Sequence, residues 1–362
     1  MRVGFELTAL ELDSTGTARA IRSLERELAT RVDLVAFGHP RGGGGRIRRA
    51  LARELWWFPV ALPRAAIRAR LDVLHCPAPL APLRSPVPLV VTLYDTAGFD
   101  HPEWLTRENA LHQRFVVAPA LRSAARVVTS SEFARERIAR HVRVPLERIE
   151  VVPLGVDPVF GPGAVDEHVL ARLGVKRPYV LTVGTLQPRK NLEAALTAFE
   201  LLDDGLQLVV AGARGWSDAE LVARLGNARA ADRIKLAGRL SDDDLVSLYR
   251  GAGCLIYPSR YEGFGLPPLE AMACGTPVVA SNATSIPEVV GDAALLAEPD
   301  DPATIAAAVE DALARREELA ARAREHAAQF TWGRTADALT RVYEAVAGSG
   351  SRCSSKSRDE RR

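Results

Sequence analysis

Residues 261–275 read YEGFGLPPLEAMACG, and they lie between the apolar runs CLIYPS and TPVVAS. Short apolar runs of this kind are typical of buried parallel strands, so the quoted segment is predicted to connect two strands through a loop and a helix. Pro267 and Pro268 suit the first turn of that helix, where no intrahelical N–H partner is required, and Gly275 suits its C-terminal cap. The segment therefore indicates one strand–helix–strand unit of an α/β fold.

Two glutamates, Glu262 and Glu270, stand eight positions apart in this segment. Glu270 is predicted in the first helical turn and Glu262 in the glycine-bearing loop before it. Even on one continuous helix, eight residues would turn the two side chains roughly 80° apart and separate them by about 12 Å along the axis. This geometry disfavours a glycosidase-like acid/base pair. A nucleotide site at the carboxyl end of a parallel strand and a solvated helix start remain as interpretations.

The same alternation of short apolar runs and amphipathic stretches continues along the whole chain. It predicts parallel sheets covered by helices. In the first half, strands are predicted at 2–7, 32–37, 72–76, 87–93, 126–130 and 149–152. In the second half, they are predicted at 179–184, 206–211, 233–237, 253–257, 276–280 and 293–297. Because 362 residues exceed the usual size of one hydrophobic core, two doubly wound domains are the expected assembly.

The domain boundary is expected in 153–168, where Pro and Gly are dense and no periodicity is sustained. We predict a first Rossmann-like domain at 1–158 and a second at 159–330. A helix at 331–347 is expected to cross back to the first domain. The tail 348–362 has no apolar anchor and is expected to be disordered.

Composition excludes several classes of protein. The apolar fraction of 47% and the charged fraction of 25% are ordinary for a globular protein, and a net charge of +2 does not indicate nucleic-acid binding. No apolar run is long enough for a signal peptide or a membrane span. The chain has four scattered cysteines, Cys76, Cys254, Cys274 and Cys353. Their spacing matches neither a metal knuckle nor a disulfide framework, which fits a reducing cytoplasm.

Residues 41–70 form a basic segment with eight arginines and one glutamate beside Trp56, Trp57 and Phe58. Its glycine run does not match G-x-G-x-x-G, so no dinucleotide site is indicated. Two interpretations stay open. The segment contacts the surface of an anionic membrane, or it is a solvated face with buried tryptophans.

Arg189 and Lys190 follow the strand predicted at 179–184 and precede the helical sequence NLEAALTAFELL. Cations at a helix N-terminus are unfavourable because that end carries a partial positive charge. A bound diphosphate would reverse this cost, since the helix N-terminus and both side chains attract phosphate oxygens. The alternative is a pair of solvated cations.

Asp242 and Asp244 form a D-x-D, a pattern that elsewhere binds a metal ion and a diphosphate. Ser241 is a good N-cap, and acidic residues in the first turn stabilise a helix without any metal. We therefore expect a helix start here and no metal site.

The sequence E-G-F-G-L-P-P-L-E at 262–270, together with VGTLQPRKNL at 183–192 and AGRLSDDDL at 237–245, resembles retaining glycosyltransferases of the GT-B fold. The similar family is glycosyltransferase family 4, which includes bacterial mannosyl and rhamnosyl transferases. The resemblance covers the chain to about residue 347 and implies two Rossmann-like domains facing a central cleft. It implies a retaining, metal-independent hexosyltransferase without a cofactor. The donor would be a nucleoside diphosphate sugar, with mannose or a related sugar, and the acceptor a saccharide or lipid-linked molecule of cell-surface glycan synthesis.

The resemblance also assigns expected roles by position. Glu270 corresponds to the carboxylate that binds the donor ribose, and Glu262 to the carboxylate that faces the donor sugar. Arg189 and Lys190 correspond to the pair that neutralises the leaving diphosphate. Gly238, Arg239 and Leu240 are expected to line the base pocket. The other substrate-binding positions are expected at Gly184, Thr185, Gly263, Phe264, Gly265 and Leu266.

In the first domain, Gly16 opens a predicted helix. Two interpretations stay open: its backbone approaches a phosphate or an acceptor, or the glycine only starts the helix.

Relatives carry His-Asp where this chain has Tyr94-Asp95, and the resemblance places these side chains near the reacting carbon. A tyrosine, with a reference pKa of about 10, cannot supply an imidazolium near neutral pH. Tyr94 favours one alternative function, a catalytically weak or inactive sugar-nucleotide-binding subunit. A nucleotide-sugar epimerase or hydrolase on the same fold also stays open. His75, on a predicted apolar strand, is interpreted as a satisfied core residue.

Overall fold

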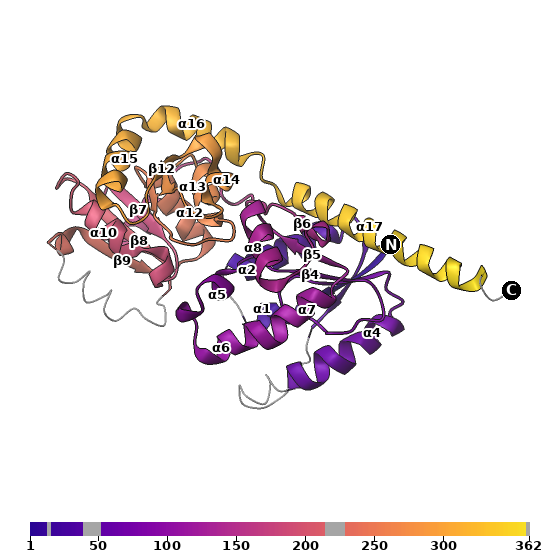
Figure 1. Ribbon diagram of the computed structural model, residues 1–362. Coiled ribbons are helices and arrows are strands. Elements are labelled where there is room, and N and C mark those ends of the chain that lie inside the picture. The colour runs from indigo at the N-terminus through magenta and orange to yellow at the C-terminus, as the bar shows by residue number, and fades with distance from the viewer. Residues whose placement is uncertain (13–15, 39–51, 214–228, 360–362) are drawn as a thin grey trace. The chain divides into compact units, whose positions relative to one another are not determined.

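The computed structural model describes residues 1–12, 16–38, 52–213 and 229–359 (Figure 1). Part of the basic segment 41–70, residues 41–51, therefore lies outside the described residues. The chain divides into two compact units. Unit 1 comprises Met1–Gly155 and Trp332–Arg362, and unit 2 comprises Val156–Thr331. In the described ranges, no helix combines the length and the apolar content needed to cross a bilayer.

Unit 1 is built on a six-stranded parallel sheet in the order β2-β1-β3-β4-β5-β6. Its middle strands are buried along their length because helices cover both faces of a parallel sheet. The strands are β1 (Arg2–Glu6), β2 (Asp33–Phe37), β3 (Val73–Cys76), β4 (Leu89–Thr92), β5 (Arg126–Thr129) and β6 (Ile149–Val151).

Unit 2 repeats this plan with a second parallel sheet in the order β12-β11-β10-β7-β8-β9. Its strands are β7 (Tyr179–Val183), β8 (Gln207–Ala211), β9 (Ile234–Gly238), β10 (Leu255–Tyr257), β11 (Val278–Ser281) and β12 (Leu295–Ala297). Each of the predicted strands lies within about two residues of its observed bounds. The predicted α/β fold class with two doubly wound sheets is confirmed.

Helices join most successive strands in both units, although β3 and β4 are joined without one, and further helices follow the last strand, β12 (Figure 1). In unit 1 they are α1 (Ala9–Leu12), α2 (Gly16–Leu28), the π-helix η1 (Arg53–Ala61), α4 (Leu62–Arg68), α5 (Ala97–Asp100), η2 (Pro102–Trp104), α6 (Arg107–His112), the π-helix η3 (Gln113–Val117), α7 (Ala118–Ser123), α8 (Glu132–Val142), η4 (Leu146–Arg148) and α17 (Trp332–Asp359). In unit 2 they are α9 (Glu167–Leu173), η5 (Pro188–Lys190), α10 (Leu192–Phe199), η6 (Ala231–Arg233), α12 (Asp242–Gly251), α13 (Leu266–Ala273), α14 (Ile286–Val290), η7 (Gly291–Ala293), α15 (Pro302–Ala314) and α16 (Arg316–Ala327).

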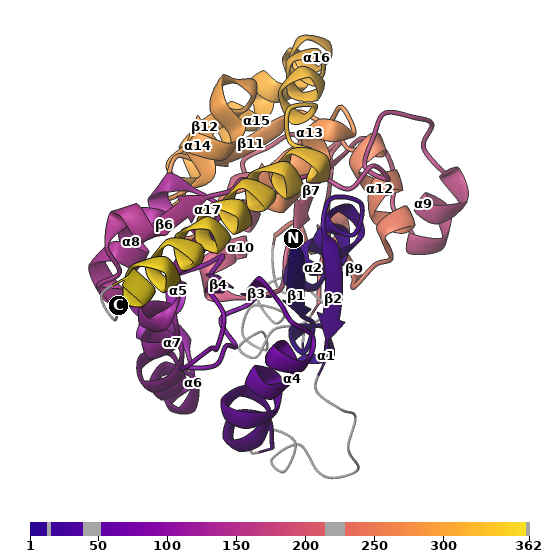
Figure 2. The same ribbon diagram turned by 90° about the vertical axis from the view of Figure 1, so that its right-hand side faces the viewer.

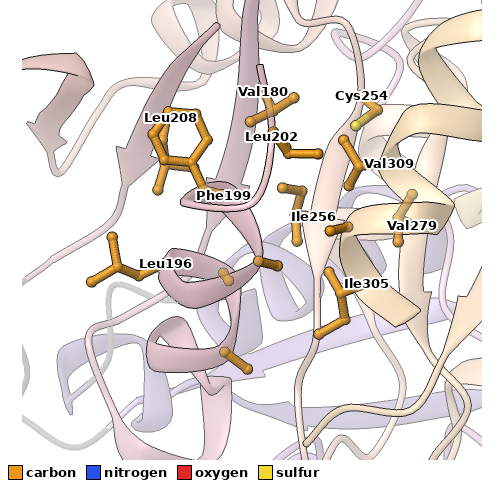
Figure 3. Close-up of a cluster of buried hydrophobic side chains, with 14 of the residues drawn as sticks. Val180, Leu196, Phe199, Leu202, Leu208, Cys254, Ile256, Val279, Ile305 and Val309 are labelled. Carbon is orange, nitrogen blue, oxygen red and sulfur yellow. The ribbon is translucent and has the colours of Figure 1, made fainter. Parts of the chain in front are cut away.

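One core cluster of unit 2 packs side chains of the sheet against α10 and α15 (Figure 3). Apolar residues recur every three or four positions on α10 and α15, so one face of each helix meets the strands. The members that Figure 3 labels are all buried: Val180, Leu196, Phe199, Leu202, Leu208, Cys254, Ile256, Val279, Ile305 and Val309. This packing fixes the strand ends, from which the loops of the candidate site start.

The long helix α17, yellow in Figure 2, contacts α2 and β3 of unit 1. Its first turns are anchored by Thr335, whose hydroxyl donates to the carbonyl of Pro153 at 2.8 Å, and by Asp337, which pairs with Arg31 at 2.6 Å. The sequence predicted a disordered tail at 348–362, but α17 continues to Asp359. Once the anchored turns form a nucleus, each added residue gains one backbone hydrogen bond, which favours this continuation.

His75 links α17 to the sheet. Its Nδ1 lies 2.6 Å from the Tyr343 hydroxyl, and its Nε2 lies 2.8 Å from the hydroxyl of Thr92. Burial lowers the pKa of His75 to about 3, so the ring is neutral and has one donor and one acceptor nitrogen. Both nitrogens are satisfied, which confirms His75 as a satisfied core residue.

We expect Tyr343→Phe to lower the free energy of unfolding of unit 1 by about 1–3 kcal/mol, because it leaves a buried ring nitrogen of His75 without a partner. Urea denaturation followed by tryptophan fluorescence measures this, since Trp56, Trp57, Trp104 and Trp332 belong to unit 1. Tyr94→Phe is the matched control, because the buried Tyr94 hydroxyl has no partner among the described residues. Equal losses in the two variants would contradict the proposed link.

Candidate functional site

The candidate site begins where three neighbouring strands of unit 2 end in glycine. The amide of Gly184 donates to the carbonyl of Ala211 at 2.9 Å, and the amide of Gly212 donates to that of Gly238 at 2.8 Å. A Cβ on Gly212 would lie 1.9 Å from the Gly184 carbonyl oxygen, and Gly212 has a φ of +156°. Only glycine fits such a close approach of two backbones. Gly212 was not predicted, although its place after the apolar run LQLVVA resembles that of Gly184 after YVLTV.

A small recess lies beside these strand ends. It brings together three predicted site residues, Gly184, Thr185 and Lys190, with the strand residue Tyr257. Its complete lining is Thr182, Val183, Gly184, Thr185, Leu186, Lys190, Leu192, Val210 and Tyr257. Ligands of doubly wound folds bind at this carboxyl edge of the sheet.

Arg189 and Lys190 lie on the short helix η5 and both bind Glu262. Arg189 Nη1 lies 3.0 Å from Glu262 Oε2, and Lys190 Nζ lies 2.5 Å from Glu262 Oε1. The cationic side chains are only 25% and 15% exposed. The interpretation of two solvated cations is therefore wrong, since a buried counter-charge holds both in place.

Glu262 is the centre of a hydrogen-bond network. Besides the two cations, its Oε1 accepts from the hydroxyls of Tyr257 at 2.8 Å and Ser259 at 2.5 Å. Burial by itself would raise the pKa of this carboxyl, but the charges of Lys190 and Arg189 outweigh it and lower the pKa to about 2. Glu262 is thus a carboxylate at neutral pH and cannot serve as a general acid.

The loop that carries Glu262 is fixed through its backbone as well. The amide of Glu262 donates to the Thr284 hydroxyl at 3.1 Å, and its carbonyl accepts from Ser285 at 2.9 Å. Sequence reasoning missed Tyr257, Ser259, Thr284 and Ser285. Ser259, two residues after the apolar strand β10, could have been indicated by that position. Thr284 and Ser285 lie more than 20 positions from Glu262 in the chain and carry no such signal.

Glu270 belongs to a different group of contacts. It is 3% exposed, and the hydroxyl of Tyr249 donates to its Oε2 at 3.1 Å. Tyr249 is not among the side chains that hold Glu262, which binds Arg189, Lys190, Tyr257 and Ser259.

The helix α13 bears out the prediction for its ends and corrects the place of Glu270. Pro267 and Pro268 follow directly on the first residue, Leu266, and Gly275 after the helix has a φ of +81°. The sequence predicted Glu270 in the first turn of the helix. Because α13 starts at Leu266, Glu270 is its fifth residue and lies just past that turn. Gly265 precedes the helix with a φ of +116°, next to the loop residues Gly263 and Phe264.

The D-x-D at 242–244 opens α12 as predicted. Ser241 caps the helix by accepting from the amide of Asp244 at 3.2 Å, and the Asp244 carboxylate pairs with Arg172 at 2.5 Å. In the part of the chain that the structure describes, no three His, Cys, Asp or Glu side chains gather to hold a metal ion. Gly238, Arg239 and Leu240 form the link between β9 and this helix, and Gly238 and Arg239 are exposed.

The predicted residues of unit 1 lie at its own strand ends and on helix starts. Tyr94 and Asp95 follow β4, and an Asp95 oxygen accepts from the amide of Ala97 at 2.6 Å at the start of α5. Burial raises the pKa of the Tyr94 hydroxyl above its usual value. Gly16 is the exposed first residue of α2. The structure thus brings Gly184, Thr185 and Lys190 to one recess, with Glu262 bound to Lys190, and places Gly16, Tyr94 and Asp95 on the other unit.

Family models match most of the chain in two blocks. The model of "Glycosyl transferases group 1" matches residues 170–330, and that of "Glycosyltransferase Family 4" matches residues 14–160. The first block falls in unit 2 and holds the glycine turns, the cation pair and both glutamates.

Curated relatives carry names of sugar transferases. The chain is 38% identical to O-antigen chain mannosyltransferase B of Escherichia coli over 67% of this chain and 66% of the relative. It is 34% identical to the serotype-specific mannosyltransferase WbdA of Escherichia coli over 59% of this chain but only 28% of the relative. It is 35% identical to D-inositol 3-phosphate glycosyltransferase of Salinispora arenicola over 85% of this chain and 77% of the relative. The chain thus matches about two thirds or less of the first two relatives.

Solved structures share the fold at low sequence identity. Sucrose-phosphate synthase from Thermosynechococcus elongatus superposes with a TM-score of 0.77 at 20% identity, covering 96% of this chain and 100% of that one. The Anabaena protein HepE in complex with UDP-glucose gives a TM-score of 0.75 at 19% identity, covering 95% and 100%.

We expect Glu262→Gln to lower the free energy of unfolding of unit 2 by about 3 kcal/mol at pH 7. This is the low end of the cost of breaking a buried ion pair, because both cations keep some contact with water. Urea denaturation followed by circular dichroism measures the loss. Glu325→Gln, on the exposed face of α16, is the control and should change little.

Comparison of the wild type with Glu262→Gln at several pH values also tests the pKa of Glu262. A folded pKa of about 2, against the ordinary glutamate value of 4.5, means that this carboxylate stabilises the fold above about pH 4.5 and loses that effect as the pH falls toward 2. The stability difference between wild type and Glu262→Gln should therefore shrink over this window. A constant difference would contradict the assigned interaction.

Proposed function

The chain belongs to the glycosyltransferases of group 1 and Family 4, with the GT-B fold, and on this premise we propose the reaction that it performs. We propose that it transfers a hexose from a nucleoside diphosphate sugar, with retention of the anomeric configuration. Mannose or a related sugar is favoured because two of the relatives are named mannosyltransferases. The name of one of them, an O-antigen chain enzyme, supports a saccharide or lipid-linked acceptor in cell-surface glycan synthesis.

The observation that carries this proposal is the joint binding of Arg189 and Lys190 to one buried carboxylate beside the recess. Two cations fixed next to the N-terminus of α10 form a strong anion site. Because Glu262 already holds both side chains in place, a diphosphate that enters the recess meets positive charge that needs little rearrangement to bind it. Positive charge held in place before the reaction stabilises the negative charge that develops on a leaving diphosphate.

Further roles follow for the other residues of unit 2. Glu270, held by Tyr249, is proposed to bind the donor ribose, and the link at 238–240 is proposed to border the base. The backbone at 263–266 is proposed to meet the sugar and the diphosphate. In unit 1, Gly16, Tyr94 and Asp95 are proposed to act on the acceptor side and at the reacting carbon.

The protonation state of Glu262 limits the mechanism. Because its carboxyl stays ionised and bound to cations, it cannot protonate a leaving group. We propose that the acceptor hydroxyl attacks an oxocarbenium-like sugar on the face from which the diphosphate departs. An oxygen of the departing phosphate takes the acceptor proton, so the reaction needs neither a protein base nor a metal ion. We place the reaction in the cytoplasm, at the inner face of the membrane, with a peripheral contact through 41–70.

We expect Arg189→Ala and Lys190→Ala each to lower kcat at saturating donor by about a hundredfold or more, because each removes charge that stabilises the leaving diphosphate. A donor-consumption assay with a saccharide acceptor measures kcat. Arg260→Ala is the matched control, since Arg260 is a neighbouring cation that pairs instead with Asp300 at 2.7 Å. Unchanged kcat in the two site variants would rule out this role for the cation pair.

Product analysis separates the proposed transfer from the alternatives. We expect the anomeric proton coupling of the product to match that of the donor, and chelation of divalent metal ions to leave the rate unchanged. A subunit that only binds sugar nucleotide would show a thermal shift with nucleoside diphosphates but no transfer. An epimerase or hydrolase would consume donor at a rate that added acceptor does not alter. An inverted product would contradict retention.

A further inference from the structure

One helical stretch of unit 1 is apolar on both of its faces. Within Arg53–Arg68, which spans η1 and α4, Trp57, Phe58 and Leu62 are buried in the core of the unit. The opposite face exposes Leu55 by 70%, Trp56 by 51% and Ile67 by 60%. Leu55, Pro59 and Ile67 are spaced by multiples of four, and Pro59 is exposed as well, so these residues follow one side of the stretch. The core does not account for this outer stripe.

A second exposed stripe lies on α6 and η3. Leu111 is 56% exposed and Phe115 is 63% exposed, and they stand four residues apart on consecutive helices. Arg107, four residues before Leu111, is exposed on the same stretch, and the guanidinium of Arg114 lies 5.7 Å from the ring centroid of Phe115. Large apolar side chains and arginines thus alternate on this surface too.

The helical stretches that carry the two stripes are in contact. His112 Nε2 lies 3.6 Å from Glu54 Oε1, and these two residues are the chain neighbours of Leu111 and Leu55. Both views place α4 and α6 at the same end of unit 1 (Figures 1 and 2). We call Leu55, Trp56, Ile67, Leu111 and Phe115 together the two-stripe surface.

The charge around the two-stripe surface is strongly positive. Residues 52–70 and 107–117 contain six arginines, Arg53, Arg64, Arg68, Arg70, Arg107 and Arg114, against two glutamates, Glu54 and Glu108. Glu54 is already held by Arg53 at 3.0 Å and by His112. Arg64 and Arg68 flank Ile67 on α4, and both are exposed. The surface therefore complements a partner that is apolar inside and negatively charged at its rim.

We propose that the two-stripe surface rests on an anionic lipid bilayer. Trp56, Phe115 and the three aliphatic side chains enter the headgroup region, and the surrounding arginines bind lipid phosphates. A helix that lies along the surface, with large apolar side chains outward and arginines beside them, matches the chemistry of interfacial helices. This inference deepens the membrane contact in the proposed function and extends it from 41–70 to α6 and η3. It does not depend on transfer chemistry, because lipid binding needs neither donor nor acceptor.

Sedimentation with vesicles tests the proposal. We expect the full chain to bind phosphatidylcholine vesicles that contain about one third phosphatidylglycerol and to release them as the salt concentration rises. Vesicles of phosphatidylcholine alone should bind far less. Trp56→Ser combined with Phe115→Ser should weaken binding by about tenfold or more, since two large apolar side chains no longer leave water. Leu201→Ser combined with Leu296→Ser, which changes two exposed leucines of unit 2, is the matched control and should bind like wild type.

A second variant separates charge from apolar contact. Arg64→Glu combined with Arg68→Glu should remove the preference for anionic vesicles while leaving the apolar residues in place. Equal thermal unfolding midpoints confirm that each variant is folded. The proposal is overturned if wild type fails to bind anionic vesicles or if neither double variant weakens binding. A dimer interface at this surface would overturn it too. In that case the wild type would bind no vesicles, and light scattering would show a dimer that becomes a monomer in the Trp56→Ser and Phe115→Ser variant. A variant that no longer binds vesicles but still transfers sugar to a water-soluble acceptor leaves the proposed function intact.

Discussion

The binding of Arg189 and Lys190 to the single carboxylate of Glu262 is the interaction on which the site of unit 2 depends. It joins the loop after β7 to the loop after β10, two segments more than 70 positions apart in the chain. Neither partner would be stable in its place alone. Two cations at the start of a helix oppose its dipole, and an isolated buried carboxylate would take up a proton. Each charge therefore makes the position of the other favourable, and the result is an anion site with its positive charge already in position.

This arrangement gives the two glutamates of the opening segment different tasks. Glu262 is ionised and surrounded by donors, whereas Glu270 lies on α13 and accepts from Tyr249. The loop between them contains glycines, and Gly265 adopts a φ of +116° that most residues avoid. The short spacing in sequence thus brings together no catalytic pair. It places one carboxylate against the cations Arg189 and Lys190 and the other on the adjacent helix α13.

In unit 1, a buried side chain again joins segments that are distant in the chain, here through hydrogen bonds of the neutral His75 ring. His75 has no charge because burial lowers its pKa to about 3, and it uses both ring nitrogens to connect Thr92 of β4 with Tyr343 of α17. The C-terminal helix is therefore held to the first sheet by polar contacts within its core. The apolar residues that this unit leaves exposed on η1, α4, α6 and η3 lie on other helices, which leaves them available for the lipid contact proposed above.

The sequence by itself determined the strands, the ends of α13 and the N-cap at Ser241. These features depend on period, on proline and glycine conformations and on short-range hydrogen bonds, all of which act between residues close in the chain. The sequence did not determine that Glu262 neutralises Arg189 and Lys190, that Tyr257, Ser259, Thr284 and Ser285 hold it, or that Gly212 must approach Gly184. It also misplaced Glu270 by a fraction of a turn, because the helix starts only after Gly265. Those contacts join residues that are distant in the chain, and only the folding of the parallel sheet, which gathers all of its loops at one edge, brings them within reach.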